Sequence, residues 1–78
     1  MKAKVYVTLK NGVLDPQGAA IQKSLKNIGV QGISNVRQGK FFEIELEAGV
    51  DANEQVKKAC ESVLANTVIE NFKYELVA

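Results

Sequence analysis

The chain has 78 residues, one cysteine, no histidine and a formal net charge of +1 at pH 7. This length predicts a single domain spanning residues 1–78, and the near-neutral charge argues against nucleic acid or an anionic membrane as the main partner. Without histidine and with a lone cysteine, the chain lacks the commonest general base and the ligands of a cysteine-type zinc site, so we expect no catalytic residue, cofactor site or metal site in it.

Residues 2–10 are the first predicted element, a half-buried strand. Apolar and polar side chains alternate along this segment, which is the pattern of a strand with one buried face. The alternation assigns Val5, Val7 and Leu9 to the inner face and Tyr6 to the outer face, where lysines lie on either side of it.

Residues 16–28 are the first predicted helix. Asp15 is a good N-cap, Pro16 fits the first helical position, and Gly29 lies where a left-handed C-cap is favoured. The apolar side chains have helical spacing and form one stripe that we expect to be buried. This stripe consists of Ile21, Leu25 and Ile28, with Ala20 beside it.

Residues 33–38 and 41–47 predict two strands joined by a tight turn at Gly39 and Lys40, which together make a hairpin. In the second strand the alternation is clean. Its inner side chains are Phe42, Ile44 and Leu46, and its outer side chains are Phe41, Glu43, Glu45 and Glu47.

Residues 51–65 predict the second helix, with Asp51 as N-cap and Glu54 completing a capping box. Its apolar face has helical spacing and consists of Val56, Ala59, Cys60, Val63 and Leu64. Residues 68–77 predict a last strand. One face of that strand carries Val68, Phe72, Tyr74 and Leu76.

The predicted element order is therefore β-α-β-β-α-β. This order indicates an α+β fold, a two-layer sandwich in which an antiparallel sheet carries two helices on one face, as in ferredoxin-like folds or a variant of them.

Cys60 is the only strong nucleophile of the chain, and we interpret it as a core residue. It lies in the middle of the buried stripe of the second helix, whereas a reactive thiolate needs partial exposure and a positive neighbourhood. The alternating Glu43, Glu45 and Glu47 are interpreted as a solvated strand face, because no histidine or aspartate supports them as ligands or catalytic acids.

The outer sheet face leaves one alternative function open, that of an RNA-recognition-like module binding single-stranded RNA. In such domains bases stack on aromatic side chains of the sheet, a role that Tyr6 and Phe41 would fill. Glu43 and Glu45 share the face of Phe41, however, and carboxylates repel phosphate. Lys4 and Lys10 are expected to neutralise them. We therefore favour a mixed-charge face that packs against another protein.

The turn at residues 11–18 and the predicted hairpin turn contain the other candidate contact residues. Leu14 is a bulky apolar residue in a turn, explained by a contact or by a hydrophobic staple on the helix start, and Gln17 has no local structural role. Arg37 and Lys40 flank the predicted hairpin turn. With Tyr6 and Phe41, these four residues form our predicted subunit interface.

A small enzyme of acylphosphatase type is a third alternative on the same fold. Such an enzyme needs a loop that holds phosphate after the first strand. Asp15 puts a carboxylate in this loop instead, which disfavours an anionic ligand.

Three segments, residues 13–18, 36–40 and 68–72, have the sequences VLDPQG, VRQGK and VIENF. With the chain length and element order, they resemble the PurS subunit family of phosphoribosylformylglycinamidine synthase, over nearly the whole chain. The first segment is the most specific. Thr67 departs from the family pattern, in which proline often precedes the last strand. The junction before that strand is therefore expected to be less rigid than in relatives with proline.

The resemblance implies a small non-catalytic subunit of an enzyme in de novo purine (IMP) biosynthesis. In such complexes a glutaminase subunit releases ammonia from glutamine, and a large synthetase subunit uses ATP and magnesium to add it to the formylglycinamide ribonucleotide. The resemblance further implies that the chain bridges these two subunits as a homodimer or tetramer and supports ammonia transfer. The single cysteine and the lack of a long apolar segment predict a cytoplasmic protein.

Overall fold

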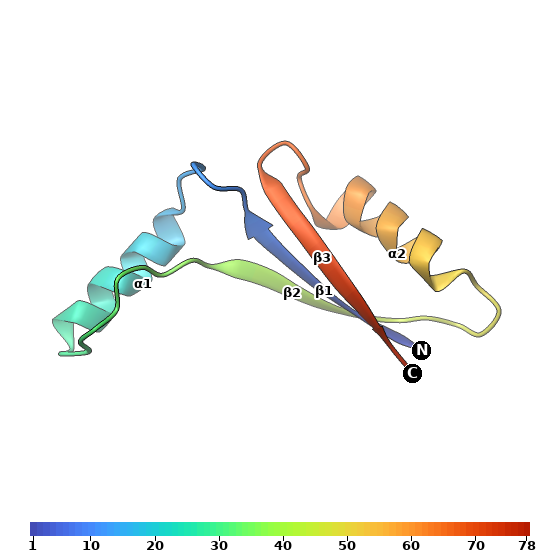
Figure 1. The fold of residues 1–78 in the computed structure, drawn as a ribbon, viewed down its shortest axis with the longest axis horizontal. Helices are drawn as coiled ribbons and strands as arrows, with labels where there is room; N and C mark the ends of the chain where they lie inside the picture. Colours follow the sequence, from blue (N-terminus) through green and yellow to red (C-terminus); the bar gives the residue numbers. More distant parts are fainter.

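The computed structural model describes all residues from Met1 to Ala78 and contains one three-stranded antiparallel sheet with two α-helices. In chain order the elements are β1 (Lys2–Leu9), α1 (Pro16–Asn27), β2 (Gly39–Glu45), α2 (Ala52–Ala59), the π-helical turn η1 (Cys60–Leu64) and β3 (Glu70–Val77). The sheet order is β2-β1-β3, so the first strand is central (Figure 1). The α+β class, the antiparallel sheet and the two helices are confirmed.

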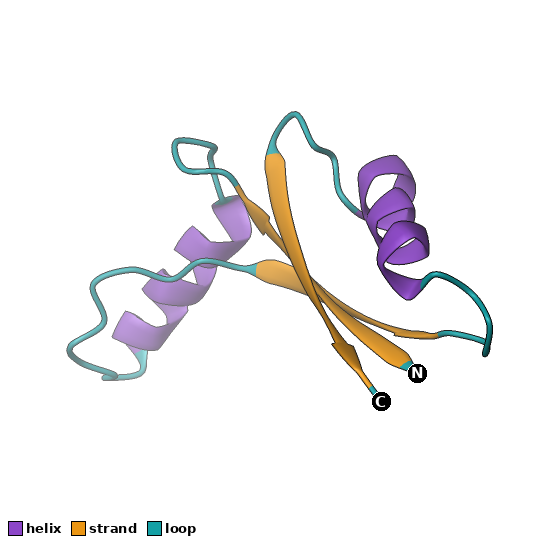
Figure 2. Ribbon diagram, turned by 45° about the vertical axis from the view of Figure 1, so that its right-hand side comes forward, coloured by secondary structure: helices purple, strands orange, loops and turns teal.

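The molecule is elongated, with extents of 51 × 27 × 14 Å. Helix α2 packs against the sheet, whereas α1 lies beyond the end of the strands with the loops that flank it (Figures 1 and 2). We call residues 10–38, which leave and rejoin the sheet there, the α1 arm. The expectation that both helices cover one sheet face is therefore wrong for the isolated chain, in which only α2 does so. Neither helix is long and apolar enough to cross a membrane.

The core is a small cluster between β1 and α2. Its fully buried members are Ala3, Val5 and Val7 on the strand, with Val56 and Cys60 opposite them. The neighbouring strands add side chains that are partly buried around this cluster. These are Phe42 and Ile44 from β2, Leu46 directly after β2, and Phe72, Tyr74 and Leu76 from β3. The predicted inner side chains of these strands are thus confirmed, with the exception of Val68, which is 80% exposed because β3 begins only at Glu70.

The predicted hairpin is not formed, and residues 33–38 are not a strand. The backbone of this segment bonds to the α1 region instead, since Gln22 donates to the Ser34 carbonyl and Gln38 donates its N–H to Asp15. Gly39 does not turn either, because it has no positive φ and lies opposite Thr8 in the β1–β2 ladder. The strand therefore begins where a turn was predicted.

The second helix changes its winding halfway. Asp51 accepts from the Glu54 N–H at 3.2 Å, which confirms the predicted N-cap. From Cys60 the chain continues as a π-helical turn, whose wider winding rotates later side chains away from their α-helical positions. Val63, which the regular spacing places on the buried face, is consequently 81% exposed. The predicted stripe is right for Val56 and Cys60 and wrong for Val63.

Helix α1 has the predicted caps but not the predicted burial. The side chain of Asp15 accepts from the Gly18 N–H, and Gly29 has a φ of +89°. The apolar stripe, however, is not packed against the sheet, and Ile21 is 41% and Ile28 is 75% exposed. The reason is the position of α1 beyond the sheet, which leaves the stripe free for an intermolecular contact.

Candidate functional site

The outer sheet face carries an aromatic pair, as the alternation predicted. Tyr6 on β1 lies opposite Phe41 on β2, and the centroids of the two rings are 5.2 Å apart. The Lys73 ammonium lies 5.3 Å from the centre of the Tyr6 ring, within the range of a cation–π contact. Phe41 is half exposed. The pair thus forms an amphipathic surface suited to packing against another protein.

Carboxylates and lysines surround the aromatic pair. The Tyr6 hydroxyl donates to Glu75 at 3.0 Å, and this bond is the main reason why the pKa of Tyr6 is raised above its ordinary value. Lys2 pairs with Glu43 at 3.5 Å, so the predicted neutralisation of this glutamate comes from Lys2 and not from Lys4 or Lys10. Nucleic-acid affinity depends on cations that neutralise phosphates, and on this face the carboxylates of Glu43 and Glu75 lie close to the aromatic pair, where they would repel a phosphate.

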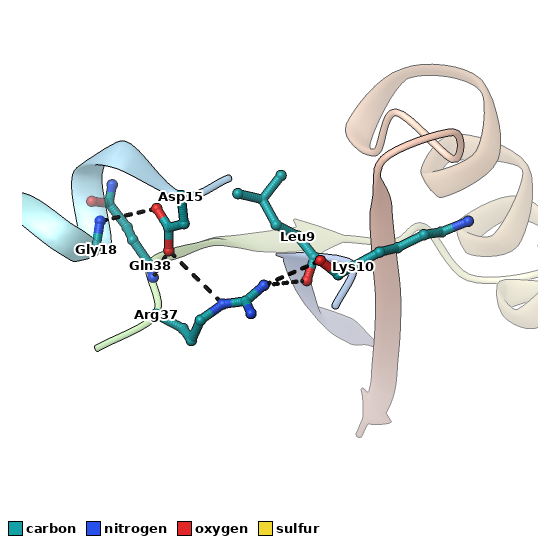
Figure 3. Close-up of polar contacts among 6 residues, drawn as sticks. All are labelled: Leu9, Lys10, Asp15, Gly18, Arg37 and Gln38. Atoms are coloured by element: carbon teal, nitrogen blue, oxygen red, sulfur yellow. Dashed lines mark hydrogen bonds and ion pairs between the residues drawn. The ribbon is translucent and has the colours of Figure 1, made fainter. Parts of the chain in front are cut away.

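A polar clamp joins the α1 arm to the sheet, and Asp15 is its centre (Figure 3). One carboxylate oxygen accepts from the Gly18 N–H and the other from the Gln38 N–H, each at 2.9 Å. These two bonds tie the start of α1 to the segment that enters β2. They are also the main reasons why the pKa of Asp15 is lowered below its ordinary value, with Arg37 adding to the effect.

Arg37 is the second half of this clamp. Its Nε lies 3.9 Å from Asp15, and its terminal nitrogen donates to the carbonyls of Leu9 and Lys10 at 2.8 and 3.4 Å (Figure 3). These carbonyls belong to the exit from β1. Arg37 thus holds two separate chain segments together, in addition to its predicted role at a subunit interface.

Gly18 fits the clamp because it has no side chain. A Cβ at this position would lie 2.5 Å from an Asp15 carboxylate oxygen and 2.5 Å from the Val36 carbonyl oxygen. Both contacts are far below an ordinary van der Waals distance. Sequence reasoning missed this role, although a glycine in the first turn of a helix, where it lowers helix propensity, is a signal that could have found it.

Two of the predicted contact residues meet at a small hollow beside the clamp. Gln17 and Lys40 line a cavity of about 150 Å³ together with Glu70. Lys40 pairs with Glu70 at 3.7 Å, which closes one side of the hollow. The structure thus brings residues of α1, β2 and β3 together, and the part played by Glu70 was not predicted.

Leu14 lies apart from that hollow, on the turn that leads into α1. It is 82% exposed, so the alternative of a hydrophobic staple on the helix start is wrong. A bulky apolar side chain held in water on a capped turn is available for an intermolecular contact. The predicted interface residues therefore divide into the aromatic pair on the sheet and a second group, Leu14, Gln17, Arg37 and Lys40, at the base of the arm.

Cys60 is fully buried under the sheet. Burial, with a smaller contribution from Glu61, raises the pKa of its thiol, which is the opposite of what an activated nucleophile requires. No group of three or more His, Cys, Asp or Glu side chains is placed to hold a metal ion.

Because its folded-state pKa is lowered, Asp15 stabilises the fold above its unfolded-state pKa, and this contribution is lost as the pH falls through the folded-state value. We therefore expect the difference in urea midpoint between wild type and Asp15→Asn to shrink as the pH falls from about 5 to about 2. Asp51→Asn is the matched control at the other N-cap, where the carboxylate accepts one backbone bond. An equal pH response of both variants would contradict the clamp.

The chain matches, over residues 2–78, the family described as PurS, phosphoribosylformylglycinamidine (FGAM) synthase. Two relatives are phosphoribosylformylglycinamidine synthase subunits PurS. The one from Synechocystis is 47% identical over 77 residues, covering 96% of this chain and 77% of the relative. The one from Bacillus subtilis is 47% identical over 76 residues, covering 96% and 90%.

Solved structures agree with these sequence matches. The C2 crystal form of Bacillus subtilis PurS superposes with a TM-score of 0.89 at 46% identity, covering 99% of this chain and 98% of the other. A chain of the PurLQS structure from Thermotoga maritima superposes with a TM-score of 0.77 at 31% identity, covering 97% and 95%. The similarity thus extends to the arm as well as to the sheet.

Proposed function

Because this chain belongs to the PurS family of phosphoribosylformylglycinamidine synthase subunits, we propose that it bridges the glutaminase and synthetase subunits of that enzyme and supports the transfer of ammonia between them. The observation that carries the proposal is the match over almost the whole chain, which includes a relative solved within PurLQS. A bridging role needs surfaces rather than reactive groups. The buried Cys60, with its raised pKa, is consistent with a subunit whose partners supply the nucleophile.

In this proposal the chain acts as a homodimer or tetramer. The isolated chain has few fully buried residues, and it leaves the stripe of α1 and the Tyr6–Phe41 pair exposed. Strands β2 and β3 are both sheet edges, which association between copies would cover. Sedimentation at micromolar concentration is the test, and a monomer there would rule out the oligomer.

The surrounding chemistry is assigned to the partner subunits. ATP and magnesium act in the synthetase subunit, and this chain binds no cofactor of its own. The complex works in the cytoplasm, a reducing compartment in which a single free thiol such as Cys60 persists.

Reconstitution tests the bridging role directly. The chain is mixed with the purified glutaminase and synthetase subunits from the same source, and glutamine-dependent product formation and complex size are measured. We expect both to require the chain. If activity and complex size are the same without it, the proposed function is wrong.

A pair of matched variants locates the contact at the base of the arm. Leu14 and Val68 are exposed apolar residues of nearly equal exposure, 82% and 80%, on different turns. We expect Leu14→Ser to weaken assembly about tenfold, because an apolar contact is lost from the centre of an interface, and Val68→Ser to leave it unchanged. Equal affinities of the two variants would remove Leu14 from the proposed interface.

A further inference from the structure

The α1 arm keeps its shape through bonds between its own residues. The Asp15 carboxylate accepts from the N–H groups of Gly18 and Gln38, so the first turn of α1 is tied to the end of the segment that returns to the sheet. Farther along, the Gln22 side chain donates to the Ser34 carbonyl at 3.2 Å. Both ties join the helix to the segment that runs back from it, so the arm forms one structural unit.

Few contacts connect this unit to the sheet. Helix α1 is not packed against the sheet and lies beyond the ends of the strands (Figures 1 and 2). The chain passes between the two parts twice, once in the turn that contains Gly12, which has a φ of +86°, and once at the junction of Gln38 with Gly39. Both passages contain a glycine, which permits backbone rotations that other residues resist. Together they have the properties of a hinge.

Arg37 is the one side chain of the arm that bonds to a strand. Its terminal nitrogen donates at 2.8 Å to the carbonyl of Leu9, the last residue of β1, and at 3.4 Å to the carbonyl of Lys10 (Figure 3). Every other side-chain hydrogen bond or ion pair of the arm stays within the arm. The guanidinium is planar and its donors have fixed directions, so these two bonds restrict the angle between the arm and β1.

We propose that Arg37 is a positioning residue that fixes the angle between the α1 arm and the sheet, and that the arm moves about its two glycine-containing connections as one unit when these bonds are removed. This inference deepens the proposed function, because it names the residue that presents the arm and the aromatic pair of the sheet to the partner subunits in a single arrangement. Binding is less costly when the arrangement exists beforehand.

The distance between the arm and α2 tests the hinge. Dyes on Lys26→Cys and Lys57→Cys, two exposed positions, report this distance by time-resolved energy transfer, and the buried Cys60 is left in place. The measurement is made on single chains, which dilution separates from any oligomer. We expect a narrow distribution of distances when Arg37 is present and a clearly broader one in Arg37→Ala.

Two further variants and a local measurement separate the hinge from a general loss of structure. Lys10→Ala removes one positive charge beside the same bonds and leaves the Lys10 carbonyl in place, so it should keep the narrow distribution. Arg37→Lys should lie between wild type and Arg37→Ala, because lysine can donate to a carbonyl but lacks the planar guanidinium. The Gln38 N–H should stay protected from exchange in Arg37→Ala, since its bond to Asp15 lies within the arm.

Assembly with the partner subunits measures the consequence of the hinge. We expect Arg37→Ala to bind them about tenfold more weakly, the loss that follows when about a tenth of the arm positions are competent to bind. In the assembled complex the distance distribution of Arg37→Ala should become as narrow as that of wild type, because the partners then hold the arm.

The outcomes separate this inference from the function on which it rests. A distribution in Arg37→Ala as narrow as in wild type overturns the hinge, and weaker binding with an unchanged distribution would mean that Arg37 acts only by touching a partner. A wild-type distribution that is already broad also overturns it. If wild type does not assemble with its partners, the bridging function is wrong, and the distances in the single chain still decide whether Arg37 positions the arm.

Discussion

Val56→Asp is expected to unfold the chain, whereas Val63→Asp should change the free energy of unfolding by less than about 0.5 kcal/mol. Val56 is 1% exposed and packs in the central cluster beneath β1. A carboxylate placed there has no partner, and burying it costs more than about 4 kcal/mol, most of the stability of a domain this small. Val63 projects into water, so a carboxylate there keeps its hydration.

Urea unfolding followed by far-ultraviolet circular dichroism measures both variants. The pair tests the π-helical turn as well as the core, because a regular α-helix would put Val63 on the same face as Val56. Equal damage from the two substitutions would mean that the helix continues without the turn and that the placement of Val63 is wrong.

Gly18→Ala is expected to lower the free energy of unfolding by about 2 kcal/mol, although alanine is the better helix former. At an open helical position this change would stabilise the protein by about 0.5–1 kcal/mol. At Gly18 the new methyl group would lie 2.5 Å from the Val36 carbonyl, which is backbone and cannot rotate away. The steric cost exceeds the gain in helix propensity, because the segment that contains Val36 must move away from α1.

Ala20→Gly is the matched control, because Ala20 is exposed on the same helix. It should cost about 0.5–1 kcal/mol, the ordinary effect of glycine in a helix, so opposite substitutions two residues apart both destabilise. Amide exchange adds a local measurement: the Gln38 N–H, bonded to Asp15 in wild type, should exchange faster in Gly18→Ala. A Gly18→Ala variant more stable than wild type would contradict the clamp.

The elements that could be predicted are those set by local spacing. The alternation in β1, β2 and β3 determined which side chains point inward, and Asp15 and Asp51 began their helices where the capping pattern put them. Each of these choices depends on residues within one or two turns of each other, which a sequence displays directly.

The structure of residues 33–38 could not be predicted from local spacing. Their composition suits a strand, yet their polar backbone groups found partners in the α1 region, through Asp15 and Gln22, which no periodicity reveals. The contacts at the candidate site likewise divide into those that local alternation predicts and those between residues far apart in the sequence. The aromatic pair of Tyr6 and Phe41 was predictable from the alternation, whereas the pairing of Lys40 with Glu70 joins residues thirty positions apart.

By itself, the sequence determined the family, the element types, the inner faces of the strands and the core role of Cys60, because these depend on patterns within single segments. The tertiary structure decided the position of α1, the exposure of Val63 and the clamp of Asp15, Gly18 and Arg37. The physical reason is that backbone and side-chain donors bond to whichever acceptor the fold brings near, and distance along the chain does not reveal that choice.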